Sequence, residues 1–576
     1  MEKELEQKQE MYRHSMSHIL AKAVKELYPN VKVAIGPAID NGFYYDFDNL
    51  SITPDDFAKI EEKMKEILAR NEDFTRTEVS RRQALEMFKD EPYKLELIND
   101  LPEGAVLSVY HTGNDFYDLC RGPHVENTKF LRGFSFKINR VSGAYWRGSE
   151  KNKMLTRVYV YGFLNKEDLK AYMQQMEEAL KRDHRKLGKE LKLFFISDYS
   201  KGMPTYMPKG LTVKNELIKY WREVHQKAGY IEIETPMAMN RELWETSGHW
   251  DHYQKNMYTF KCEDDTFAIK PMNCPGGMLY YMQDMHSYKE FPLRVGELGK
   301  VHRHEASGTL SGLLRVRCFT QDDAHIFMTP NQIEGEITNV MKLVDEVYKT
   351  FGLSYTVELS TMPESHIGEV EEWEQAETAL GNALKHLGLE YKINAGDGAF
   401  YGPKIDIHVK DCIGREWQCG TIQLDMQLPK RFNLKYIDAD GTEKEPIMIH
   451  RVIYGSLERM ISILIENFAG AFPTWLSPVQ SKILTVSEKN AEYANEIANK
   501  LTLAGVRVEV DADNESVGKK IRSAVMEKTP YVLVLGDKEM AEGTVAVRAR
   551  GSKDTVTMTY AEFEAKIKDE IINRSL

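Results

Sequence analysis

The sequence predicts a multidomain protein that combines α+β and α/β architecture. Its 576 residues are enough for roughly three or four domains, each with its own core. In the middle of the chain, residues 294–327 have the pattern of two strands joined by a flexible loop. After Pro478, short apolar strands alternate with helical segments, which is typical of a compact α/β domain.

Composition limits the class of protein. The chain carries 76 basic and 88 acidic residues, a net charge of -12, so contact with nucleic acid would depend on local basic patches. No run of about 18 apolar residues occurs, and the first residues are charged throughout. The six cysteines lie far apart, follow no disulfide spacing and suit a reducing compartment: Cys120, Cys262, Cys274, Cys318, Cys412 and Cys419. We therefore expect a cytoplasmic protein with no membrane segment.

The first region, residues 1–163, opens with a helical pattern that places His14, His18 and Lys22 on one face. Further on, the sequence DLCRGPHV brings Cys120 and His124 close together beside a Gly-Pro turn. An HxxxH pattern followed by CxxxH offers four ligands at a spacing that zinc accepts. The alternative, two unrelated polar clusters, stays open at this point.

Residues 164–192 predict a densely charged helix that connects two domains. It carries one apolar stripe made of Leu169, Tyr172, Met173, Met176 and Leu180. Its basic residues could contact RNA or simply form an exposed charged face: Lys181, Arg182, Arg185 and Lys186.

The longest region, residues 193–474, begins with a predicted amphipathic helix over 210–227, followed by a strand, YIEIETPMAM, with Pro236 near its end. The segment NCPGG predicts a tight loop that presents Cys274. Later, Gly455 and Ser456 predict a helix start, with Arg459 in the first turns of that helix.

The predicted hairpin at residues 294–327 carries an unusual number of polar side chains on strands whose apolar residues should be buried: Arg303, Glu305, Arg315, Gln321, Asp323 and His325. Buried charge must be paired or used. Arg303 and Arg315 could grip an anionic ligand, because guanidinium groups bind phosphate in a two-pronged fashion. Alternatively, they could form an ion-pair network with Glu297 and Glu305.

Residues 475–576 predict the C-terminal α/β domain. Its apolar strands are KILTVS, VRVEVD, YVLVLG and VAVRAR, and helices are predicted over 488–504, over 517–528 and at the end of the chain. Three basic residues of the second helix, Lys519, Lys520 and Arg522, predict either a phosphate-binding patch or an ordinary solvated face.

The segment RHEASGTLSGLLRVRCFTQDDAHIF resembles motif 2 of the class II aminoacyl-tRNA synthetases, in particular their threonyl branch, and the similarity extends over essentially the whole chain. The helix at 210–227 and its strand resemble motif 1, which implies a homodimer, and IHRVIYGSLERM resembles motif 3. The resemblance implies a catalytic core with an antiparallel sheet at 193–474. It also implies an N-terminal editing (second additional) domain at 1–163, a linker helix at 164–192 and an anticodon-binding domain at 475–576.

The resemblance also implies the chemistry. Members of this branch activate L-threonine with ATP and Mg²⁺ and transfer the threonyl group to the 3'-terminal ribose of tRNA(Thr). One Zn²⁺ per subunit is implied on Cys274, His325 and His450, a set that no local motif identifies. Three protein ligands leave one position open for the substrate. A site that must bind a hydroxyl can discriminate threonine from valine by a factor of about 10⁴ to 10⁵. Serine differs by one methyl group, worth about 1 to 3 kcal/mol, so a second, hydrolytic site is expected.

Individual roles follow from the resemblance. Arg303 is expected on the α-phosphate, and Arg315 and Arg459 at the γ-phosphate, with Glu305 also on the nucleotide. Asp323 should accept a hydrogen bond from the substrate amine. The remaining predicted catalytic residues are His249, which would assist transfer, together with Gln321, Tyr401, Lys404, Gln418, Gln423 and Ser456. The editing residues implied are His14, His18, Lys94, Asp118, Cys120 and His124, and in this branch they work without a metal, because imidazoles can move protons near neutrality.

Some alternatives and departures stay open. Lys94 and Asp118 could instead be a solvated surface pair. Many threonyl enzymes carry a further small domain before the editing helix, and the sequence leaves open whether its absence is natural. In the threonyl branch, proline is common at the position of Ala306, and histidine is common at the position of Gly277. An inactive paralogue that serves as an RNA-binding subunit would lack the arginines or the metal ligands, and a relative that charges proline or glycine would lack the editing pattern.

Overall fold

The computed structural model describes residues 2–411 and 413–576, and it divides the chain into two compact units, Met1–Glu177 and Glu178–Leu576. Cys412, one of the six cysteines, lies outside the described residues. The division falls inside the segment predicted as a linker. Among the described helices, none combines the length and the apolar content that a membrane-spanning segment requires.

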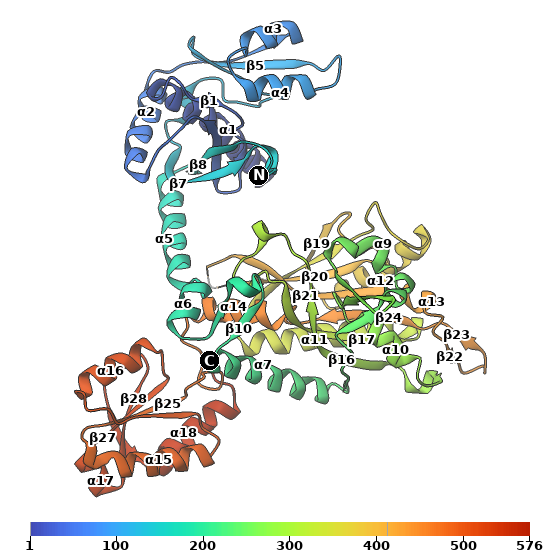
Figure 1. Cartoon of the computed structure of the whole chain (residues 1–576), viewed down its shortest axis with the longest axis vertical. Coiled ribbons are helices and arrows are strands. Elements are labelled where there is room, and N and C mark those ends of the chain that lie inside the picture. The colour runs from blue at the N-terminus through green and yellow to red at the C-terminus, as the bar shows by residue number, and fades with distance from the viewer. Residues whose placement is uncertain (1, 412) are drawn as a thin grey trace. The chain divides into compact units, whose positions relative to one another are not determined.

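The first unit is built around α1 (Glu2–Leu27), which packs on a small antiparallel sheet in the order β1-β3-β8-β7. Met16, Ile19, Leu20 and Val24 recur at helical spacing and are fully buried, so this face of α1 forms the core. A second sheet, β4-β5-β6, carries two short helices (Figure 1). The further elements are β1 (Lys32–Val33), β2 (Ala38–Ile39), β3 (Gly42–Asp48), α2 (Phe57–Ala69), β4 (Phe74–Val79), α3 (Arg81–Met87), α4 (Pro92–Asp100), β5 (Leu107–Thr112), β6 (Phe116–Leu119), β7 (Ser135–Tyr145) and β8 (Met154–Phe163).

The prediction of a single linker helix over residues 164–192 is wrong in one respect. The chain forms two helices, α5 (Lys166–Arg182) and α6 (His184–Glu190). Asp183 separates them, because its backbone leaves the helical region and its side chain accepts a hydrogen bond from the Arg185 backbone N–H as the cap of α6. Of the predicted apolar stripe only Leu169 is buried, and Leu180 is 70% exposed. Helical periodicity alone did not identify a packing face here.

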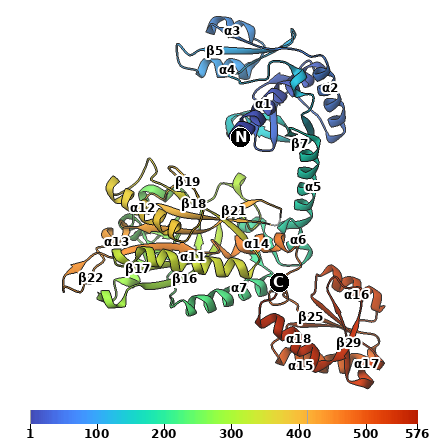
Figure 2. The ribbon, with the colours of Figure 1, turned by 180° about the vertical axis from the view of Figure 1, so that it is seen from behind.

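The second unit contains an eight-stranded sheet in the order β11-β16-β17-β24-β21-β20-β18-β19. Its interior pairs are antiparallel and only the two edge pairs are parallel, which confirms the predicted antiparallel core. Helices α7, α11 and α14 contribute buried apolar residues to the same large core as this sheet (Figures 1 and 2). The bounds are α7 (Pro208–Lys227), β11 (Ile231–Glu232), β16 (Leu293–His302), β17 (Cys318–Met328), α11 (Ile333–Thr350), β18 (Ser354–Ser360), α12 (Val370–His386), β19 (Tyr391–Asn394), β20 (Lys404–Lys410), β21 (Glu416–Asp425), β24 (Ile447–Val452) and α14 (Leu457–Asn467).

Two local predictions in this unit need correction. The strand predicted for YIEIETPMAM is split into β11 and β12 (Ala238–Asn240), which join different sheets. The chain turns where Thr235 donates to Glu297 through both its backbone N–H and its hydroxyl, and Pro236 has no N–H to continue the ladder. Cys274 does not lie in a loop: it begins α10 (Cys274–Tyr281), whose first turn accommodates Pro275.

The C-terminal part of the second unit is the predicted α/β domain, with a five-stranded sheet in the order β26-β25-β27-β28-β29. The prediction of a basic patch on one helix is wrong for Lys520, which is 2% exposed and donates to the backbone oxygens of Thr485 and Asp511. The elements are β25 (Ser481–Thr485), α15 (Ala491–Leu503), β26 (Val508–Asp511), α16 (Val517–Met526), β27 (Tyr531–Leu535), α17 (Asp537–Glu542), β28 (Thr544–Ala549), β29 (Val556–Thr559) and α18 (Tyr560–Ile572).

Candidate functional site

The register of the large sheet aligns polar side chains from four strands. His325 on β17 lies opposite His450 on β24, His450 lies opposite Gln423 on β21, and Gln423 lies opposite Lys404 on β20. Because alternate residues of a strand share a face, Asp323 and Gln321 lie on the same side as His325. Residues far apart in sequence are therefore brought together by pairing alone.

Lys404, Gln423 and His450 of this row line a cavity of about 490 Å³, a size that suits a small molecule, whereas His325 lies beside His450 outside the lining. Cys274 reaches the cavity from the start of α10, and Arg303 reaches it from the residue after the end of β16. The other lining residues include Tyr253, Met272, Gln321, Asp323, Phe400, Tyr401, Lys404, Thr421, Gln423 and His450.

Cys274, His325 and His450 form a buried group whose ligand atoms all lie within 4.8 Å of one another. One ring nitrogen of His450, Nε2, is 2.7 Å from a carboxylate oxygen of Asp425, an arrangement common for histidines that bind metals. His325 Nε2 is buried and has no hydrogen-bond partner among the described residues. A thiol and two imidazoles around such an unsatisfied atom fit a zinc ion.

Burial sets the protonation of these groups. Desolvation lowers the pKa of His325 to about 3, so its imidazole is neutral and keeps the lone pair that a metal needs. Desolvation also raises the pKa of Cys274 well above its ordinary value. A bound cation would reverse that effect, because a coordinated thiol is deprotonated.

The floor of the cavity holds fixed polar groups. Asp323 accepts a hydrogen bond of 3.2 Å from the Asn273 amide, and burial raises the pKa of its carboxyl. The Tyr401 hydroxyl donates to Gln423 Oε1 at 2.7 Å. Lys404 pairs at 2.6 Å with Asp406, which lies two residues further along β20. These contacts hold the side chains in place before any ligand binds.

A second cavity, of about 410 Å³, is lined by the three predicted arginines together with Glu305, Gln418 and Ser456. Arg303, Gln321, Thr421 and Val452 line both cavities, so the two share a wall. Its polar surface and its arginines suit an anionic ligand.

Each arginine is oriented by a different contact. Arg303 donates from Nε to the Pro271 carbonyl at 3.1 Å, and its guanidinium lies 5.1 Å from the ring centre of Phe319. Arg459 donates to the Leu314 carbonyl at 3.2 Å and to the Gln418 carbonyl at 2.6 Å. These carbonyl contacts orient the charges of Arg303 and Arg459 without neutralising them.

The alternative of an ion-pair network holds for one arginine only. Arg315 forms an ion pair of 3.0 Å with Glu305. Glu297 instead pairs at 2.7 Å with the buried Lys270, and no carboxylate of the described residues pairs with Arg303. Ser456 caps α14, as predicted, because its side chain accepts a hydrogen bond from the Arg459 backbone N–H.

His249 lies outside both cavities, as His325 does. Its side chain is fully buried, with Nδ1 2.8 Å from the Ser247 hydroxyl and Nε2 3.7 Å from Cys274 Sγ. Desolvation lowers its pKa to about 3. His249 therefore lies behind Cys274 and is not among the residues that line either cavity.

The residues of the site that were missed in the sequence include Tyr253, Met272 and Phe400, which line the first cavity, and the polar residues Asn273, Thr421 and Asp425. Thr421 and Asp425 lie two residues to either side of Gln423 on β21, so the period of two along that strand was the available signal. Asn273 directly precedes Cys274, and nothing local distinguishes it from a surface amide.

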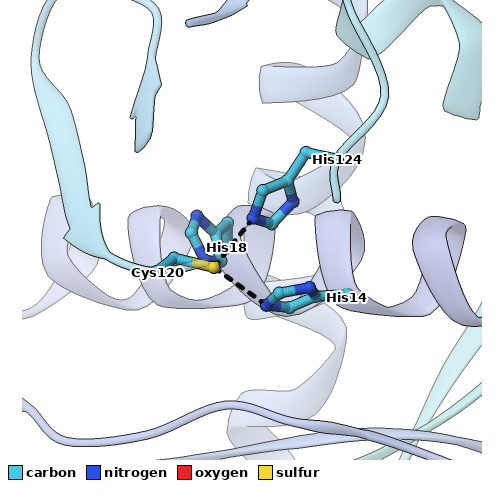
Figure 3. A group of neighbouring side chains, drawn as sticks. All are labelled: His14, His18, Cys120 and His124. Carbon is cyan, nitrogen blue, oxygen red and sulfur yellow. Dashed lines mark hydrogen bonds between the residues drawn. The ribbon is translucent and has the colours of Figure 1, made fainter. Parts of the chain in front are cut away.

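A second cluster lies in the first unit (Figure 3). His14 and His18 project from successive turns of α1, and Cys120 and His124 lie beyond the end of β6. Cys120 Sγ is 3.2 Å from His14 Nε2 and 3.2 Å from His124 Nε2. The four ligand atoms all lie within 4.8 Å of one another, so the alternative of two unrelated polar clusters is wrong.

An ion pair between Lys94 and Asp118 lies next to this cluster. The two side chains are 2% and 3% exposed, so the alternative of a solvated surface pair is wrong. Asp118 also accepts from the Tyr45 hydroxyl at 2.5 Å, and its carboxylate lies 3.8 Å from His18 Nε2. Lys22, on the same side of α1, is instead paired with Glu72 and Asp115.

Burial keeps the cluster uncharged. Desolvation lowers the pKa of His14, His18 and His124 below the ordinary value for histidine, and it raises the pKa of the Cys120 thiol to about 11. Each neutral imidazole keeps one lone pair that can accept a hydrogen bond from water.

Three known protein families match parts of this chain. Residues 258–468 match the tRNA synthetase class II core domain (G, H, P, S and T), residues 478–570 match the anticodon binding domain, and residues 107–159 match the threonyl and alanyl tRNA synthetase second additional domain.

Similar full-length proteins and a similar solved structure are known. The threonine-tRNA ligase of Clostridium tetani is 58% identical over 565 residues, which cover 98% of this chain and 88% of that protein. The threonine-tRNA ligase of Acetivibrio thermocellus is 58% identical over 566 residues, 98% of this chain and 89% of that protein. The crystal structure of the RNA binding domain of threonyl-tRNA synthetase from Cryptosporidium parvum Iowa II matches with a TM-score of 0.66 and 41% identity, over 67% of this chain and 98% of that chain.

Proposed function

Because the chain belongs to the threonine-tRNA ligase family, we propose that it activates L-threonine with ATP and transfers the threonyl group to the 3'-terminal ribose of tRNA(Thr). One observation carries this proposal. The sheet register and the start of α10 bring Cys274, His325 and His450 together, at the wall of a cavity that Cys274 and His450 line. This cavity shares Arg303 with the cavity that holds Arg315 and Arg459.

The metal proposed for the first cavity is Zn²⁺, one per subunit, held by Cys274, His325 and His450. When bound, it would supply a Lewis acid able to recognise an amino acid by its amine and hydroxyl. The protein's own residues would bind the rest of the substrate. Asp323 would accept from the amine, with Gln321 beside it. Tyr401, Gln423 and Lys404 would line the side of the cavity where the threonine side chain lies.

Activation joins a carboxylate oxygen of threonine to the α-phosphorus of ATP, and the bond from that phosphorus to the β-phosphate bridge breaks to release pyrophosphate. Arg303, on the shared wall, would hold the α-phosphate, and Arg315 and Arg459 would bind the γ-phosphate end beside Gln418 and Glu305. The position of all five residues in the lining of the second cavity supports these roles. Mg²⁺ enters with ATP. The contribution of the protein is positioning and charge stabilisation.

Hydrolysis of seryl-tRNA(Thr) is proposed for the cluster of the first unit. Water forms a bond to the ester carbonyl carbon, the bond from that carbon to the ribose oxygen breaks, and that oxygen takes up a proton. His14, His18 and His124 would move these protons, because imidazole can both accept and donate a proton. Cys120, Lys94 and Asp118 would fix the geometry.

We also propose a homodimer and a cytoplasmic location. Leu211 on α7 and Ile231 on β11 are 46% and 41% exposed, which supports an interface at these two elements. The role of His249 in the transfer step stays a prediction, and so do the domain limits 1–163, 164–192, 193–474 and 475–576.

The direct test is exchange of pyrophosphate into ATP by the purified chain. We expect exchange with threonine and almost none with valine, with discrimination of about 10⁴ to 10⁵, because valine leaves the polar groups that bind the hydroxyl unpaired. Proline is the control amino acid. An equal response to proline would contradict the proposal and favour a relative with another amino acid specificity.

His184 provides a second prediction. Its Nδ1 lies 2.7 Å from Glu466 at the end of α14, and its Nε2 accepts the Leu313 backbone N–H at 3.0 Å, two residues before Arg315. At Gly312, where φ is +50°, a Cβ would lie only 2.1 Å from His184 Nε2. His184 thus holds the loop that carries Arg315 against the helix that carries Arg459.

Replacing His184 by phenylalanine should raise KM for ATP about tenfold and leave KM for threonine nearly unchanged, because a buried backbone N–H is left unpaired at a cost of about 1 to 3 kcal/mol. The control is His184→Gln, which offers one donor and one acceptor and should recover most of the affinity for ATP. Equal increases in both KM values would contradict this role.

A further inference from the structure

The cluster of His14, His18, Cys120 and His124 has the donor set of a complete metal site. Zinc prefers thiolate and imidazole ligands at about 2.3 and 2.0 to 2.1 Å, which places tetrahedral ligand atoms about 3.3 to 3.6 Å apart. The two sulfur-to-nitrogen distances observed here are both 3.2 Å, and the remaining ligand atoms lie within 4.8 Å. Small side-chain movements would complete the tetrahedron.

The free atoms of the cluster also suit an ion. His124 is oriented by Ser15, whose hydroxyl lies 3.1 Å from Nδ1, so that Nε2 faces the thiol. Such a second partner is typical of histidines that ligate metals. His18 Nδ1 is buried and has no hydrogen-bond partner among the described residues. His18 thus has a ring nitrogen that no described protein group satisfies and that is free to bind an ion.

A third group of side chains has a composition that could bind a metal, but its hydrogen bonds are complete without an ion. Asp183, His184 and Glu466 also lie close together. There, however, both ring nitrogens of His184 already have partners, Glu466 and the Leu313 backbone N–H. That group is complete without an ion, whereas the cluster of the first unit is not.

We propose that Zn²⁺ binds to His14, His18, Cys120 and His124 and that this binding switches off the hydrolysis proposed for the same residues. The inference rests on the proposed function of the first unit. Zinc sites with four protein ligands are closed, whereas catalytic sites keep one position for water. An ion here would occupy the imidazole lone pairs that must accept protons, and it would displace the thiol proton to solvent. Occupation therefore blocks the reaction.

Binding can be tested on the full chain with Co²⁺ alone as the probe. A Cys274→Ser variant, which lacks the thiol of the other metal group, is stripped of metal and titrated. We expect one equivalent of Co²⁺ to bind with tetrahedral d–d absorption and a thiolate-to-metal charge-transfer band. Adding Cys120→Ser should abolish that band. The control, Cys262→Ser, removes an exposed thiol and should leave the band unchanged.

Binding is overturned if the Cys274→Ser chain takes up no Co²⁺, if the bound ion is octahedral, or if the charge-transfer band persists without Cys120. Inhibition is tested by following hydrolysis of seryl-tRNA by the metal-free Cys274→Ser chain as Zn²⁺ alone is added. We expect near-complete loss of hydrolysis at one equivalent and recovery with a chelator. Hydrolysis that continues with zinc bound would overturn the inhibition.

The cobalt titration and the hydrolysis assay also distinguish failure of this inference from failure of the proposed function. If the metal-free chain does not hydrolyse seryl-tRNA, the proposed function of the first unit fails. The cobalt spectrum still decides whether the cluster is a metal site, because it does not depend on any activity.

Discussion

Replacing Cys274 by serine should prevent binding of the zinc proposed for the second unit and lower threonine-dependent exchange by about 10³-fold, because a metal contributes several kcal/mol of charge stabilisation. A serine hydroxyl is a much poorer zinc ligand than a thiolate. Cys274 lies at the start of α10 and outside the large sheet, so the register that aligns His325 with His450 should survive. Hydrolysis of seryl-tRNA, assigned to the other compact unit, should continue.

Three measurements on the same preparation check this result: metal content per subunit, pyrophosphate exchange and hydrolysis of seryl-tRNA. Cys262→Ser is the matched control, because Cys262 lies in the same unit on β13 (Tyr258–Cys262) and is exposed. It should change none of the three. Loss of hydrolysis with retention of exchange would mean that the two sites have been assigned in reverse.

Local sequence patterns predicted those helices and strands whose limits depend on neighbouring residues alone. The hairpin of β16 and β17 followed from alternating apolar residues, and the start of α14 followed from Ser456 as a helix cap. The break at Asp183 was missed because charged helical periodicity continues on both sides of it. The split of the strand at Pro236 was missed because Glu297, which accepts the hydrogen bonds of the turn, lies far along the sequence on β16.

The two proposed zinc sites differ in how far sequence could predict them. His14 and His18 are one helical turn apart, and Cys120 and His124 flank a turn, so each pair was visible in the sequence. Cys274, His325 and His450 come from a helix and two strands, and only the family resemblance suggested them. Their proximity depends on strand register, a tertiary property that no spacing encodes.

Replacing Asp118 by asparagine should have the second large effect, a loss of hydrolysis together with destabilisation of the first unit. Lys94 is 2% exposed, and removing one partner of a buried ion pair costs about 3 to 5 kcal/mol. Unfolding of the full chain, followed with a probe in the first unit, measures the stability. A control is Lys22→Met, which removes a buried lysine of the same unit that pairs elsewhere. It should lower stability without abolishing hydrolysis by the folded protein.

A combined variant separates stability from chemistry. Replacing Lys94 by methionine, Asp118 by leucine and Tyr45 by phenylalanine removes both charges and the hydroxyl that Asp118 accepts from. Because a buried pair exchanged for apolar residues is often neutral in stability, this variant should unfold close to wild type. Hydrolysis should stay lost, since His18 would lack the carboxylate 3.8 Å from its Nε2. If hydrolysis returned together with stability, the ion pair would be structural only, and Asp118 would have no part in positioning the imidazoles.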